Sequence, residues 1–157
     1  MTLPIDLFKS ASIAYIHYLS FMICFGALIY ERISVKPNPR KEEAISMVVA
    51  DIIYGIAGIA LLVSGIYRVL KFGQGSDFYT QNPIFWTKII VFALVGSLSL
   101  YPTITYVLWA IPLSKGNLPN VTQNLVSRLR LIINIELVGF VSIPFLATLM
   151  ARGIGLG

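Results

Sequence analysis

The sequence contains few charged residues. Only 12% of its 157 residues are Asp, Glu, Lys or Arg, whereas about 25% are charged in an ordinary soluble domain. Hydrophobic residues make up 57% of the chain. So few charges cannot cover a surface that faces water, so the composition excludes a soluble globular domain and indicates an integral membrane protein.

Cysteine and histidine each occur once, as Cys24 and His17. One cysteine excludes an intramolecular disulfide and a zinc cluster. One histidine excludes a haem held by two histidines of the same chain. The net charge is +5, and the basic residues flank the apolar runs instead of clustering. This distribution favours contact with lipid headgroups and argues against nucleic-acid binding.

Long apolar runs occur four times, and each is long enough to cross the ~30 Å hydrocarbon core of a bilayer as a helix. The strict alternation typical of strands is absent. We therefore predict an all-α integral membrane four-helix bundle with short loops, a single domain over residues 1–157. The predicted helices cover about residues 8–33, 42–71, 83–112 and 122–151. An even number of spans places both termini on one side, and a small excess of Lys and Arg in the first and third loops favours termini outside.

Polar residues recur every seven positions along two of these helices. In the first helix the series includes His17, Cys24 and Glu31, and in the second it includes Asp51 and Gly65. Such spacing keeps side chains on one slowly drifting stripe of a helix. Small residues on the second stripe allow another helix or a flat ligand to come close.

Basic residues form the first of two predicted polar layers, in the half of the membrane nearer the termini. His17 lies inside an uncharged run of twenty residues, Ala11–Tyr30. A neutral imidazole is a good haem ligand, but it can equally bond a backbone carbonyl, a Tyr or a Ser across the bundle. Lys88 either extends its amine to the headgroups or pairs with a propionate or a substrate carboxylate. Arg68 is either an interfacial anchor or a second propionate clamp.

Carboxylates distinguish the second predicted layer, in the half nearer the first and third loops. It comprises Asp51, Glu136, Arg128 and Arg130, with Glu31 at its edge. One interpretation is a structural ion pair between the acids and the arginines. The other is a path for protons or cations.

Several segments resemble the bacterial membrane proteins grouped as domain of unknown function 2214. They are YIH in the first helix, YER at its end, AD-x-x-YG in the second helix, GIYRVLKFGQG-x-x-FY-x-x-NP-x-FW-x-K through the second loop, and SLYPT-x-x-Y-x-x-W after it. The resemblance covers roughly residues 15–109. It implies a multi-pass protein of a bacterial inner (plasma) membrane or a thylakoid-type membrane.

A more distant resemblance concerns two residues. A histidine inside the first helix and an aromatic-x-Lys motif opening the third resemble HemJ-type protoporphyrinogen oxidases and, more loosely, CopD-type copper-resistance membrane proteins. In the HemJ group the corresponding histidine and lysine are the functionally critical pair, and a b-type haem is bound. The resemblance implies haem b as cofactor, with functional roles for His17, as axial ligand of the iron, and for Lys88.

These observations support three hypotheses. The favoured one is a membrane protein that binds haem b or a related tetrapyrrole at the three basic residues and acts in redox chemistry or electron transfer. The second is a non-catalytic membrane subunit or assembly factor, in which Gly55, Gly58 and Gly65 pack against a partner in a homo-oligomer or larger complex. The third is a small transporter or metal-handling protein that uses the two intramembrane carboxylates.

Overall fold

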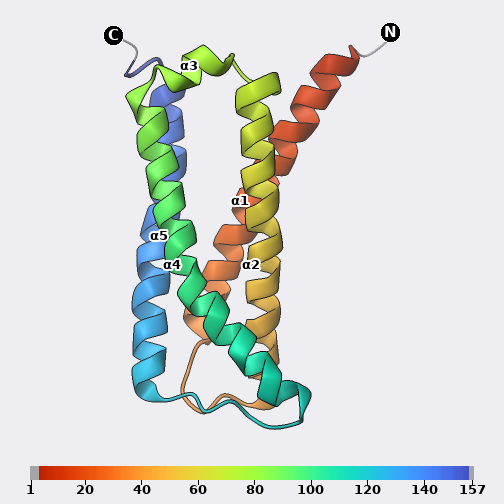
Figure 1. Ribbon diagram of the computed structural model, residues 1–157, viewed down its shortest axis with the longest axis vertical. Helices are drawn as coiled ribbons and strands as arrows, with labels where there is room; N and C mark the ends of the chain where they lie inside the picture. Colours follow the sequence, from red (N-terminus) through yellow and green to blue (C-terminus); the bar gives the residue numbers. More distant parts are fainter. Residues whose placement is uncertain (1–3, 156–157) are drawn as a thin grey trace.

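Four long helices form the molecule, as the computed structural model, which describes residues 4–155, shows (Figure 1). Each is long and apolar enough to cross a membrane. No strand occurs in the described part of the chain, so the predicted all-α membrane bundle is confirmed. Both described ends lie at the same end of the bundle, as an even number of spans requires. The long helices are α1 (Ile5–Ser34), α2 (Lys41–Tyr67), α4 (Pro83–Ser114) and α5 (Gln123–Ala151).

The observed helix bounds differ from the predicted ones by at most four residues, at the end of α2, where a π-helical turn, η1 (Arg68–Phe72), continues the predicted helix. A short helix within the second loop, α3 (Ser76–Thr80), was not predicted. Tyr79 of α3 is buried against Phe85 and Met150, so this apolar contact holds α3 against the end of the α4–α5 pair.

Side-chain caps fix where two of the long helices begin. The Asn82 carboxamide oxygen accepts a hydrogen bond from Ile84 N at 2.9 Å, which caps α4, and its nitrogen donates to Ile154 O at 3.1 Å. At the start of α2, Glu43 accepts from Arg40 N at 2.9 Å and pairs with Lys36 at 2.9 Å. These bonds satisfy backbone donors that a helix end leaves free and tie each loop to its helix.

The long helices pack chiefly as two pairs, α1 with α2 and α4 with α5 (Figure 1). The N-terminal half of α1 leans away from the bundle (Figure 1). Phe21 of α1 packs against Phe140 of α5, with ring centroids 5.3 Å apart. α4 bends near its middle, where Pro102 removes a backbone donor. Large apolar side chains such as Ile59 and Val138 point outward, 66% and 72% exposed, which fits a surface that faces lipid.

α4 and α5 approach closely at one glycine. A Cβ atom on Gly139 of α5 would overlap the Cγ2 atom of Val95 on α4. Val95 is itself buried in the central apolar cluster with Cys24, Leu61 and Phe140. The missing side chain at Gly139 is therefore what lets the two helices pack at this distance.

Candidate functional site

His17 is fixed by α2 at one ring nitrogen. Its Nδ1 lies 3.1 Å from Leu61 O and 3.0 Å from Ser64 Oγ. A carbonyl oxygen can only accept, so Nδ1 carries the hydrogen, while the Ser64 hydroxyl donates to Ala60 O at 2.6 Å. The alternative of a histidine bonded to a carbonyl and a serine across the bundle is thus observed. It leaves Nε2 as the nitrogen with a free lone pair whenever the ring is neutral.

A glycine makes room for this ring. A Cβ atom on Gly65 would lie 3.2 Å from His17 Cε1, tighter than an ordinary contact. The seven-residue stripes of α1 and α2 thus meet here. In the second hypothesis Gly65 packs against a partner protein, and that stays a prediction; within this chain the position of its missing Cβ atom faces His17.

Arg68 and Lys88 join His17 from two further elements, η1 and α4. The Arg68 guanidinium lies 4.8 Å from the ring centroid of Tyr18, and Lys88 Nζ lies 5.3 Å from that of Phe85. Both cations are near enough to His17 to interact electrostatically with it. We call these three residues the basic site; within the described residues neither cation forms an ion pair.

The donor set of the basic site fits a haem better than a bare metal ion. No three His, Cys, Asp or Glu side chains of residues 4–155 are arranged to hold a metal. A porphyrin supplies four nitrogens itself, so a single imidazole suffices as protein ligand. Two unpaired cations beside that imidazole match the charge of two propionates.

Acidic side chains gather at a second place, nearer the first and third loops. Glu31 of α1, Asp51 of α2 and Glu136 of α5 are buried and lie within electrostatic range of one another. Tyr106 of α4 lies within range of all three. Thr103, also of α4, donates a hydrogen bond of 2.7 Å to Asp51. We call the three acids the carboxyl site, and all four long helices line it.

Of the two interpretations of this layer, the structural ion pair with Arg128 or Arg130 is not observed, since every ion pair in the described chain is made by Glu43. Arg128 is exposed, and Arg130 donates to Val35 O at 2.8 Å. Arg130 is partly buried, with its Nε enclosed without a hydrogen-bond partner.

Glu31, expected only at the edge of the layer, is instead 1% exposed and a full member of the carboxyl site. The signal for it was present in the sequence. Glu31 lies two seven-residue steps after His17, on the stripe that faces the interior.

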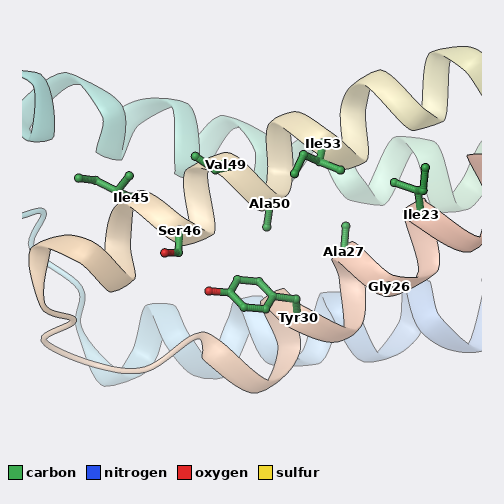
Figure 2. Close-up of a pocket in the computed structure, with 9 residues that line it drawn as sticks. All are labelled: Ile23, Gly26, Ala27, Tyr30, Ile45, Ser46, Val49, Ala50 and Ile53. Atoms are coloured by element: carbon green, nitrogen blue, oxygen red, sulfur yellow. The ribbon is translucent and has the colours of Figure 1, made fainter.

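An apolar groove lies between α1 and α2 (Figure 2) and is lined by none of the residues of the two sites. Its volume is about 450 Å³, and small residues such as Gly26, Ala27 and Ala50 line it beside Tyr30. Gly55 and Gly58 lie further along α2, and a Cβ atom added to either would have no neighbouring atom within 4 Å. That Gly55 and Gly58 pack against a partner stays a prediction.

Comparison with known proteins bears on the whole chain. No curated protein and no solved structure matches it. A family model described as "predicted membrane protein (DUF2214)" matches residues 9–155. The match takes in both sites and all of the long helices except the first four residues of α1, and the description agrees with the four membrane-spanning helices. The chain therefore belongs to the DUF2214 family of predicted membrane proteins.

Proposed function

We propose that this protein binds haem b, or a related tetrapyrrole bearing carboxylates, at the basic site and acts in redox chemistry or electron transfer. The observation that carries the proposal is the hydrogen bond between His17 Nδ1 and Leu61 O at 3.1 Å. A histidine that ligates a metal almost always donates its other ring N–H to a carbonyl or carboxylate, which orients the ring and raises its basicity. His17 is held in this way, with Nε2 left for the iron.

Charge supports the same assignment. Arg68 and Lys88 are partly buried in a membrane-spanning bundle without an acidic partner among the described residues. Unpaired charges at such depth are costly, so they call for an anionic ligand. Two propionates would neutralise them, with the planar guanidinium of Arg68 suited to a two-point contact.

Each residue of the basic site would hold a different part of the tetrapyrrole. When bound, the haem iron would supply one-electron chemistry. His17 would orient the macrocycle through its fixed ring, and Arg68 and Lys88 would set its register through the propionates. The aromatic rings of Tyr18 and Phe85, over which the two cations lie, would limit the access of water.

The test is the absorption spectrum of the full-length protein, oxidised and then reduced with dithionite, after expression with ample haem. We expect a Soret band typical of b-type haem in the wild type and its loss in His17→Ala. Tyr15→Ala, an exposed aromatic on the same helix, is the matched control and should keep the band. A colourless wild type, or a band that persists in His17→Ala, would contradict the proposal.

The space beside His17 gives a second prediction. Gly65→Leu should displace the imidazole, because even a Cβ atom at this position crowds His17 Cε1 at 3.2 Å, and should reduce haem occupancy at least about tenfold, equivalent to about 1.4 kcal/mol. Gly58→Leu, on the same helix without a neighbour, should leave the spectrum unchanged. Haem content per protein, measured by pyridine haemochrome, decides the matter. Equal content in both variants would refute the role of Gly65.

A second candidate function is a non-catalytic membrane subunit or assembly factor. It is favoured by the small-residue face of α2, where Gly55 and Gly58 leave open space beside them in their own chain. Small residues let helices of different proteins approach closely in a membrane. The same Gly58→Leu variant tests it: loss of a stoichiometric co-purifying partner would support this function, and a clean homo-oligomer unaltered in the variant would count against it.

A further inference from the structure

We propose that the carboxyl site is an intramembrane proton-binding site, formed by Glu31, Asp51 and Glu136 and distinct from the basic site. It draws on none of the residues assigned to tetrapyrrole binding. The proposal rests on where the acids lie, on what their oxygens contact, and on the absence of a neutralising cation around them in the described chain.

All three acids of the carboxyl site are buried. Glu136 is 0% exposed and Glu31 is 1% exposed, and both belong to helices that cross the membrane. Asp51 is also buried, and its carboxylate accepts the hydroxyl of Thr103. Three ionised carboxylates at this depth would repel one another and would each lose hydration at a large cost.

Independently of burial, several polar atoms of the carboxyl site have no hydrogen-bond partner. Both carboxylate oxygens of Glu136, Oε1 of Glu31 and the hydroxyl of Tyr106 are enclosed without a hydrogen-bond partner. Tyr106 is 0% exposed and lies within electrostatic range of all three acids. Buried polar atoms are nearly always paired in folded proteins, so a group of them at one place indicates a ligand or water between them.

The charged groups on the surrounding elements do not neutralise the site. On α1, Arg32 donates to Asn134 at 2.6 Å. On α5, Arg130 donates through one terminal nitrogen to Val35 O, its Nε is buried without a hydrogen-bond partner, and it forms no ion pair with the acids. In the first loop, Lys36 pairs with Glu43. α4 contributes only hydroxyl groups, those of Thr103 and Tyr106, and in the described chain every ion pair is made by Glu43.

A proton meets the needs of the site better than a metal ion. The three acids are not arranged as a metal-binding group in the described structure, and Asp51 already accepts from Thr103. A proton needs no coordination shell. Once on a carboxyl group, it removes one charge and turns an acceptor into a donor, which can then bond a neighbouring carboxylate or the Tyr106 oxygen.

Infrared difference spectroscopy of the full-length protein in lipid nanodiscs tests this inference. We expect the C=O stretch of a protonated, buried carboxylic acid near neutral pH, shifted in D₂O and lost in Glu136→Gln. Glu42→Gln, an exposed acid in the first turn of α2, is the matched control and should keep the band. Asp51→Asn and Glu31→Gln provide further variants should Glu136→Gln fail to elute as a folded protein.

Two results would overturn the inference. One is the absence of the band from the wild type, or its persistence in all three variants of the site. The other is a melting temperature that rises with Na⁺ or Ca²⁺ at constant ionic strength in the wild type but not in Glu136→Gln, which would make the ligand a metal cation. The haem spectrum should be the same in the wild type and Glu136→Gln, so this test is independent of the function proposed above.

Discussion

Gly139→Leu is expected to lower the free energy of unfolding by about 3 kcal/mol, the upper end of the usual cost of overpacking. A Cβ atom at this position already overlaps Val95 Cγ2. Val95 is buried and β-branched, so its side chain has one preferred rotamer in a helix and little room to turn away. The larger leucine must therefore push α4 and α5 apart where Gly139 faces Val95.

Thermal unfolding in detergent, followed by far-ultraviolet circular dichroism, measures this change. Gly96→Leu is the matched control, because Gly96 follows Val95 on the same helix but faces open space. Gly139→Ala alone should also destabilise the bundle, and adding Val95→Ala should recover most of the loss, since the two sites then share about the original volume. Equal melting temperatures for Gly139→Leu and Gly96→Leu would show that the helices do not pack through Gly139.

The fold was largely predictable from the sequence because a bilayer leaves few choices. A run of about twenty apolar residues must become a helix in lipid, and four such runs in succession must alternate in direction. The short helix α3 was not predictable in this way. Its Tyr79 packs against Phe85 and Met150, and no local sequence pattern indicates the contact with Met150, which lies far away in the sequence.

For the two sites, the sequence predicts only how deep in the membrane each residue lies. Counting residues from the helix ends placed His17 with Lys88, and Asp51 with Glu136, at similar levels, and the structure brings each pair to one site. Counting cannot say which way a long side chain turns. Arg130 lies at the same depth along its helix as the acids, but its guanidinium donates to Val35 O. The long, flexible side chain of arginine makes this possible.

The carboxyl site should cost the protein stability. Glu136→Met, which keeps the approximate volume and removes two buried oxygens without partners, is expected to raise the free energy of unfolding by about 1–3 kcal/mol, the usual cost of leaving a buried polar group unsatisfied. A proton on the site reduces this cost without removing it, since the Tyr106 hydroxyl and the other acids stay in an apolar surrounding. Thermal unfolding of both proteins in the same detergent measures the difference.

Glu43→Met serves as the control, because it should lower the stability of the protein, whereas Glu136→Met should raise it. Glu43 accepts from Arg40 and pairs with Lys36, so its removal uncaps α2 and frees the first loop, which should lower the melting temperature. A lower melting temperature for Glu136→Met as well would mean that Glu136 has a stabilising partner, and the site would then have to be structural. A higher melting temperature for Glu136→Met would show that Glu136 destabilises the fold. A destabilising residue of this kind is expected where it serves function and not folding.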